Sequence, residues 1–269
     1  DQKRHRQVSQ VISMWSGPRN LSTAMMRSFG ARADCAVLDE PFFAPFLKVT
    51  GKLHPGRDET LAAHETDAAI VAARCEAAAP NGEALFFQKH MPHHMIDGFS
   101  LSWAQNAKHF FLLRDPARVI ASYAKGRAEF TLDDLGYAPQ KRLYDRLESM
   151  TGTPPPIVDS VDILAAPEAM LRALCAALRI DFDPAMLSWE AGPRPEDGAW
   201  APYWYASVER STGFGAPPSH EPDVPEIYQP VLEACREDYA ALGGFVDEIQ
   251  DVDDVLKGQE RRVGTKAAE

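Results

Sequence analysis

The chain has 269 residues, of which 45% are hydrophobic and 25% are charged, a composition typical of a globular protein. Its formal net charge of −11 argues against a general nucleic-acid binder, which would carry a broad basic face. No apolar run approaches the roughly 20 residues of a membrane span, and residues 1–10 are too polar for a signal peptide. We therefore expect a cytoplasmic protein that binds neither nucleic acid nor membrane.

The length predicts one large α/β domain over residues 10–245, with flexible segments at 1–9 and 246–269. The four cysteines are widely scattered and form no C-x-x-C pair, so we expect buried, reduced thiols without a disulfide or a zinc site. Oligomeric state is left open. In so acidic a chain, an anionic ligand requires a local basic cluster, for which the candidates are Arg19, Arg27, Lys89, Arg114 and Arg118.

Short apolar runs alternate with helical stretches along the chain. This pattern favours an α/β fold, with a doubly wound, mainly parallel sheet of about five strands and helices on both faces. The predicted strands are residues 11–15, 36–38, 84–88, 109–113 and 156–160. The predicted helices are residues 20–30, 58–79, 116–127, 139–150, 167–179 and 225–242.

The segment from Val11 to Phe29 is a short apolar strand that passes through a tight turn into a helix, the layout of a phosphate-binding loop. Free N–H groups of the first helical turn and the positive end of the helix dipole attract an anion there. Arg19 adds a cation, and Ser22 and Thr23 add hydroxyl donors. The loop lacks the lysine of G-x-x-x-x-G-K-[ST], so a magnesium-bound triphosphate is not indicated. The alternative is an ordinary turn with Arg19 solvated.

The predicted strand 84–88 runs into a polar turn that carries Lys89, His90, His93 and His94. His90 is expected at the same sheet edge as the phosphate-binding loop, where it could take a proton from a hydroxyl or amine. No cysteine or carboxylate lies beside the three histidines, so we expect no metal site. The ordinary alternative is a solvated loop histidine.

Arg114 follows the predicted strand 109–113, and Ser122 lies eight residues later in the next helix. Ligands gather at the carboxyl ends of strands in a doubly wound sheet, so Arg114 should share an edge with the first loop. A guanidinium can bind a phosphate through two hydrogen bonds, and Ser122 can add a third. The alternative pairs Arg114 with an acidic neighbour such as Asp115.

Residues 192–225 differ from the rest of the chain because they are rich in Pro, Trp and Tyr and lack a helical period. We expect an ordered surface loop. Two interpretations stay open: its aromatic residues pack it onto the domain, or it closes over a ligand as a lid.

Together these segments resemble the sulfotransferase family that uses 3′-phosphoadenosine 5′-phosphosulfate (PAPS). The resemblance covers residues 10–125, with a weaker echo at 211–214. The stretches SGPRNLSTAMM, LDEPFF and QKHMP are similar to a bacterial and plant branch of sulfotransferase-like proteins. The resemblance implies a P-loop NTPase-like sulfotransferase fold.

The resemblance also implies roles for single residues. The first loop would hold the 5′-phosphosulfate through Gly17, Pro18, Arg19, Asn20, Leu21, Ser22 and Thr23. Arg114 and Ser122 would hold the 3′-phosphate, and the weaker echo adds Thr212 and Gly213 to the nucleotide site. His90 would deprotonate the acceptor, with Arg19 and Lys89 stabilising the developing charge. If His90 is not the base, His93 or His94 is the next candidate, and Glu40 follows if all three histidines can be replaced without loss of activity. No metal is implied.

The sequence thus predicts a sulfotransferase that moves a sulfuryl group from PAPS to a hydroxyl or amine of an unidentified small molecule. It departs from many family members at three positions: Arg19 replaces lysine, Leu21 replaces glycine, and Lys89 adjoins His90 directly. Two alternatives stay open. One is a P-loop nucleotide or small-molecule kinase, with Asp39 or Asp159 holding a metal. The other is a nucleotide-binding module without catalysis, which would tolerate loss of His90.

Overall fold

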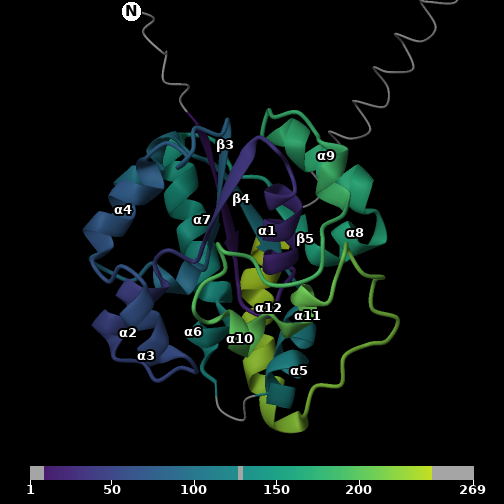
Figure 1. Ribbon diagram of the computed structural model, residues 1–269. Helices are drawn as coiled ribbons and strands as arrows, with labels where there is room; N and C mark the ends of the chain where they lie inside the picture. Colours follow the sequence, from purple (N-terminus) through teal and green to yellow (C-terminus); the bar gives the residue numbers. More distant parts are fainter. Residues whose placement is uncertain (1–8, 127–129, 244–269) are drawn as a thin grey trace, which may run out of the picture.

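The computed structural model describes residues 9–126 and 130–243, which build a five-stranded sheet with helices on both faces (Figure 1). All five strands are parallel, in the order β2-β3-β1-β4-β5. They are β1 (Gln10–Ser16), β2 (Cys35–Asp39), β3 (Leu85–His90), β4 (Lys108–Leu113) and β5 (Ile157–Asp159). The predicted fold class and the five predicted strands are therefore confirmed.

The helices connect successive strands, as parallel pairing requires. The α-helices are α1 (Ser22–Gly30), α2 (Phe43–Thr50), α3 (Arg57–Ala63), α4 (Ala68–Glu76), α5 (Pro116–Gly126), α6 (Leu132–Leu135), α7 (Tyr137–Thr151), α8 (Ser160–Ala165), α9 (Pro167–Ala177), α10 (Ala201–Trp204), α11 (Ala206–Glu209) and α12 (Gln229–Gly243). The 3₁₀ turns are η1 (Pro92–His94), η2 (Ser102–Asn106), η3 (Pro184–Leu187) and η4 (Glu226–Tyr228).

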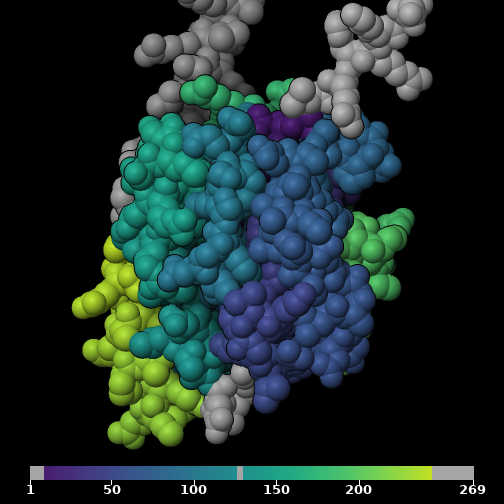
Figure 2. Space-filling model, turned by 90° about the vertical axis from the view of Figure 1, so that its left-hand side faces the viewer, coloured from purple at the N-terminus to yellow at the C-terminus, as the bar shows by residue number. Residues whose placement is uncertain are grey.

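Side chains alternate along each strand, so the sheet feeds a separate apolar core on each face. On one face, Ile12 and Phe110 pack under α1, α8 and α9. On the other, Trp15 and Phe111 pack against α4, η2 and α7. Figure 2 shows how completely residues of α4, α7 and the β3–β4 connection cover this second face. Burial of each large side chain contributes about 1.5–3 kcal/mol.

The predicted helix 58–79 is wrong, because two helices occupy that stretch. Helix α3 ends at Ala63, and α4 begins after Asp67. The Asp67 carboxylate accepts a hydrogen bond from the Ala69 N–H at 2.8 Å, which caps the start of α4. Sequence reasoning also missed α2, α6 and α8. Residue 127 of the predicted helix 116–127 and the predicted tail 246–269 lie outside the described residues.

The segment 192–225 holds two short helices, α10 and α11, rather than an irregular loop. Its Trp200 and Tyr205 are buried. Asp197 forms a bidentate ion pair with Arg27 of α1 at 2.6 and 2.7 Å. Packing of the aromatic residues is thus confirmed for two of them, whereas closure as a lid stays a prediction.

The four cysteines are buried and free, as expected. None of the helices within residues 9–126 and 130–243 combines the length and the hydropathy that a bilayer-spanning helix requires.

Two glycines let the loop after β1 approach α7 closely. Gly136, which lies between α6 and α7, has a φ of 82°. A Cβ there would lie 3.3 Å from Gly17 Cα and 3.3 Å from Pro18 Cδ. At Gly17, a Cβ would lie 3.1 Å from the Leu135 carbonyl oxygen. Side chains at these positions would push the loop away from α7.

Replacing Gly136 by Ala is expected to lower the free energy of unfolding more than replacing Gly152 by Ala. Both substitutions force alanine into a positive φ, which costs about 1–2 kcal/mol. At Gly152 nothing lies within 4 Å of the new Cβ, so that variant measures the backbone cost alone. Urea unfolding of both variants tests the difference. Equal losses would show that contact of the new Cβ with Gly17 and Pro18 adds nothing to the change in the free energy of unfolding.

Candidate functional site

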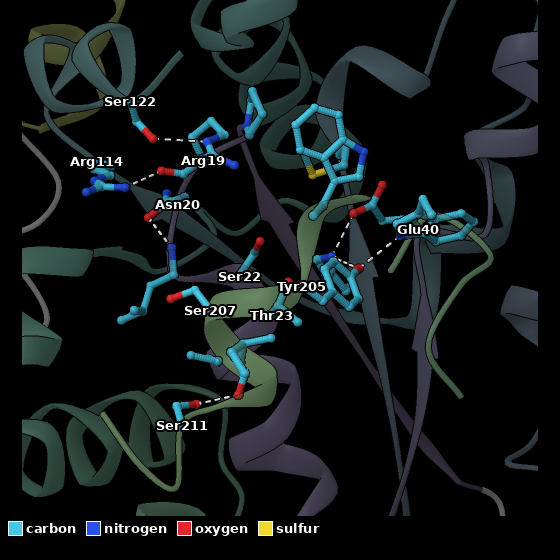
Figure 3. Close-up of a pocket in the computed structure, with 18 of the residues that line it drawn as sticks. Arg19, Asn20, Ser22, Thr23, Glu40, Arg114, Ser122, Tyr205, Ser207 and Ser211 are labelled. Carbon is cyan, nitrogen blue, oxygen red and sulfur yellow. Dashed lines mark hydrogen bonds and ion pairs between the residues drawn. The ribbon is translucent and has the colours of Figure 1, made fainter. Parts of the chain in front are cut away.

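A cavity of about 460 Å³ lies at the carboxyl ends of the strands (Figure 3). Its walls include the loop after β1, Glu40 directly after β2, Lys89 near the end of β3 and Arg114 directly after β4. Residues of α10, α11 and the stretch to Gly215 complete the lining. This is the sheet edge at which ligands bind in doubly wound folds.

The loop after β1 places Arg19 beside Arg114, which directly follows β4, and Ser122 of α5. Arg19 has a φ of 54°, a left-handed conformation that non-glycine residues rarely adopt. In it, the Arg19 Nε donates to Ser122 Oγ at 3.0 Å, and the Arg114 guanidinium donates to the Arg19 carbonyl oxygen. The structure therefore brings Arg19 together with Arg114 and Ser122, which follow it by 95 and 103 residues.

Helix α1 starts with an uncapped N-terminus that faces the cavity. Its N-cap residue, Leu21, makes no side-chain cap, and its first turn holds no acidic residue. Asn20 holds the loop in place, accepting from the Leu21 N–H at 2.7 Å and donating to the Leu112 carbonyl at 3.1 Å. Ser22 and Thr23 line the cavity. The helix dipole and free N–H groups make this end suitable for an anion.

Arg19 and Arg114 form no ion pair with a carboxylate within residues 9–126 and 130–243. Burial lowers the pKa of the Arg114 guanidinium, and the charges of Arg118 and Arg19 lower it further, against an opposing effect of Tyr137. Adjacent cations of this kind repel one another until an anion binds. The geometry thus predicts an anion between α1 and Arg114.

The other members of the expected basic cluster are already engaged. Arg27 pairs with Asp197 away from the cavity, and the Arg118 guanidinium donates to the His220 carbonyl at 3.0 Å. The Lys89 ammonium lies 2.6 Å from a Glu40 oxygen and 3.0 Å from an Asp39 oxygen. Among these five cations, Arg19 and Arg114 are the ones that line the cavity without an ion pair to a described carboxylate.

Glu40 lies across the cavity from Arg114 and Ser122, as Figure 3 shows. Its φ of 37° is also left-handed, and its N–H donates to the Lys89 carbonyl at 2.9 Å. Burial raises the pKa of the Glu40 carboxyl, the Lys89 ammonium lowers it, and the Asp39 carboxylate raises it again, with a net upward direction. Among the described lining residues, Glu40 supplies the one carboxylate.

His90 lies outside the cavity lining, although it directly follows Lys89. Successive strand residues point to opposite faces, so when Lys89 faces the cavity His90 cannot. Its ring stacks on Trp15 at 4.6 Å between centroids, and its Nε2 lies 3.1 Å from Gln88 Oε1. Burial lowers the pKa of His90 to about 3. His90 thus lies at the carboxyl end of β3, as expected, but on the side of the strand away from the cavity.

The remaining predicted nucleotide-site residues also fall into two groups, those that line the cavity and those that do not. Most of the predicted loop lines the cavity, as do Gly213, Arg114 and Ser122, but Gly17 and Thr212 do not. Gly17 is buried against α6 and α7, whereas Thr212 is exposed and its carbonyl accepts from the Trp189 N–H at 3.1 Å. Trp204 and Tyr205 also line the cavity. The sequence indicated them only through the aromatic composition of residues 200–205 and gave neither a role of its own.

Three histidines, His54, His93 and His94, also line the cavity. Burial lowers the pKa of His93 to about 4 and that of His94 well below its ordinary value, so both rings are neutral at pH 7. Within the described ranges, no group of three or more His, Cys, Asp or Glu side chains could hold a metal ion.

Comparison with known proteins adds three findings. A family model described as "Sulfotransferase domain" matches residues 10–244. Two Arabidopsis thaliana proteins, branched-chain-amino-acid aminotransferase-like proteins 2 and 1, are 40% and 39% identical over 87% and 88% of this chain. The chain spans only 41% and 42% of their lengths. Their name refers to an aminotransferase, whereas the family model matching this segment is a sulfotransferase domain.

Among solved structures, the sulfotransferase domain of the Synechococcus PCC 7002 olefin synthase is similar to this chain, with a TM-score of 0.56. The sequences are 17% identical, and the match covers 89% of this chain and 98% of that domain. This similarity supports the shared fold.

Inorganic phosphate is expected to raise the Tm of the protein, because Arg19 and Arg114 lack carboxylate partners. At a hundredfold excess over its Kd, a native-state ligand stabilises by about 2.7 kcal/mol. The R114Q variant should lose most of the shift in a phosphate titration followed by thermal unfolding. The R172Q variant is the control, since Arg172 pairs with Glu168 on the surface. An unchanged phosphate effect in R114Q would place the anion elsewhere.

Proposed function

The chain belongs to the sulfotransferase domain family, and from this premise we propose that it transfers a sulfuryl group from PAPS to a small-molecule hydroxyl or amine. One arrangement carries the proposal. Two arginines without carboxylate partners flank the uncapped start of α1 at one side of the cavity, and Glu40 lies at the other. The arginines and the start of α1 suit the anionic donor, and Glu40 suits removal of a proton from the acceptor.

The donor would lie along the loop between β1 and α1. The N–H groups at the start of α1, with Ser22 and Thr23, would bind the 5′-phosphosulfate. Arg114 and Ser122 would bind the 3′-phosphate. Arg19 already donates to Ser122, so its guanidinium links the two phosphate sites. Its charge would also stabilise the negative charge that develops on the leaving phosphate.

Glu40 is proposed as the general base. The acceptor oxygen or nitrogen would form a bond to sulfur as the bond from sulfur to the phosphate oxygen breaks. The acceptor proton would pass to Glu40, and 3′-phosphoadenosine 5′-phosphate (PAP) would leave. A carboxylate whose pKa is raised by burial accepts a proton more readily than an exposed one. Glu40 thus takes the role that the sequence predicted for His90.

The kinase alternative receives less support. Asp39 accepts hydrogen bonds from Lys89 and Tyr205, at 3.0 and 2.6 Å. Asp159 caps α8 through the Val161 N–H at 3.0 Å and accepts from the Tyr239 hydroxyl at 2.7 Å. Both carboxylates proposed to hold a metal are thus engaged within the fold.

The acceptor side of the cavity is lined by rings. Phe43 lies there against Trp200 and the neutral imidazole of His94, with ring centroids 5.1 and 4.7 Å away. The Lys89 ammonium is already paired, and Arg19, 5.9 Å from the centre of the Trp204 ring, is assigned to the donor, so no cation of the described lining remains for an acidic acceptor. We infer that the acceptor is small and uncharged apart from the group that reacts.

PAP without metal is expected to raise the Tm more than ATP with magnesium does, because the site offers two arginines and its described residues include no group of side chains that could hold a metal ion. The R114A variant should bind PAP about tenfold to a hundredfold more weakly, yet bind AMP, which lacks the 3′-phosphate, nearly as well as the parent. Thermal shift and calorimetry measure both effects. A larger shift with ATP and magnesium would favour the kinase.

Glu40→Gln is expected to lower kcat by about 10²–10⁴ and leave PAP affinity nearly unchanged, because the base contacts the acceptor rather than the donor. His90→Gln should retain turnover, since His90 lies outside the cavity. Transfer from radiolabelled PAPS to a panel of phenols, alcohols and amines measures kcat, and calorimetry measures PAP binding. Turnover kept by Glu40→Gln and lost by a folded His90→Gln would return the base assignment to His90.

A further inference from the structure

A buried polar network surrounds the ammonium group of Lys89. The ammonium donates to Asp39 Oδ1 at 3.0 Å, to Glu40 Oε1 at 2.6 Å and to the Tyr205 hydroxyl at 2.5 Å. The side chain of Lys89 is only 2% exposed. All three N–H donors are therefore used, and one positive charge serves two carboxylates.

The two carboxylates hold unequal positions in this network. Asp39 is 1% exposed and accepts three hydrogen bonds, from Lys89, from the Tyr205 hydroxyl at 2.6 Å and from the Gly198 N–H at 3.1 Å. Glu40 is 11% exposed, lines the cavity and receives a short hydrogen bond from Lys89. Asp39 is therefore the more firmly held of the two carboxylates, whereas Glu40 faces the cavity.

Resting on the proposed function, we propose that Asp39 is a positioning residue for the transfer reaction. It holds the Lys89 ammonium, and so leaves the Glu40 carboxylate available to accept the acceptor proton. Without the Asp39 charge, Lys89 would pair with Glu40 alone, and Glu40 would become a weaker base. The sequence pattern Asp-Glu, which begins at the last residue of β2, thus places the carboxylate that holds Lys89 beside the proposed base.

Tyr205 completes this arrangement from a distant part of the chain. Its hydroxyl donates to Asp39 and accepts from Lys89 and from Trp200 Nε1, the last at 2.9 Å. Burial raises the pKa of Tyr205 well above its ordinary value, so the hydroxyl keeps its proton. The charged or titratable groups facing Glu40 are Asp39 from β2, Lys89 from β3 and Tyr205 between α10 and α11. Each acts on the Glu40 carboxyl through a contact or a short-range charge.

The test is a carbon-13 NMR titration of the glutamate side-chain carboxyls in the full chain, with Glu40→Gln identifying the Glu40 signal. In the unmodified protein, Glu40 is expected to titrate above the ordinary glutamate pKa of about 4.3. Asp39→Asn should lower the Glu40 pKa by about one to three units, because one neighbouring negative charge is lost. Asp34→Asn is the control, since Asp34 pairs with Arg32 outside this network. An unchanged Glu40 pKa in a folded Asp39→Asn variant would overturn the proposal.

A second measurement needs no variant of Asp39, so misfolding of that variant cannot hide the answer. In the unmodified protein the Glu40 signal alone is followed, and its pKa should lie above the ordinary value of about 4.3, because Lys89 is shared with Asp39. A Glu40 pKa at or below that value would overturn the proposal. Failure of the proposed function would show separately, as absence of stabilisation by PAP, because these titrations require neither donor nor acceptor.

Discussion

The buried ammonium of Lys89 is the interaction on which the site depends. It joins the end of β2, the end of β3 and Tyr205 from the α10–α11 segment. Removing one partner of a buried, hydrogen-bonded ion pair costs about 3–5 kcal/mol, because the other charge is left without compensation. Lys89 therefore ties the wall formed by α10 and α11 to the sheet, and keeps Glu40 directed at the cavity.

Backbone strain marks the same edge of the sheet. In the described part of the chain, the non-glycine residues with positive φ are Arg19, Glu40 and Arg179, and the first two line the cavity. Arg19 and Glu40 each follow the carboxyl end of a strand, where the chain must turn sharply towards a helix. The strain carries a cost in free energy, and the surrounding contacts hold it in place. The proposed donor site and the proposed base are thus both placed by sharp turns, one after β1 and the other after β2.

The order of the strands explains why these turns converge. β1 lies between β3 and β4, so the loop after β1 has Lys89 on one side and Arg114 on the other. The strand order thus puts Arg19 and Arg114 on one side of the cavity and the Glu40 carboxylate on the other. A bound donor and an acceptor would meet between them, over the N-terminus of α1. Separation of the two charges by the cavity prevents Glu40 from neutralising the arginines that the donor requires.

Local pattern was sufficient to predict much of this protein. The apolar runs identified five parallel strands, and the strand–loop–helix at Val11–Phe29 with Arg114 and Ser122 identified residues that line the cavity, because these signals lie within short stretches of sequence. The break between α3 and α4 was missed, since alanine-rich stretches flank it on both sides, but the extended backbone of His64 ends α3 and the Asp67 carboxylate caps the start of α4. The sequence placed His90 at a strand end, but it does not say which neighbour points into the cavity. Strand register and burial decide that, and they bring Lys89 to the cavity and His90 under Trp15. Tyr205 joined the site through tertiary packing, because aromatic composition marks its segment but does not reveal a contact across 116 residues.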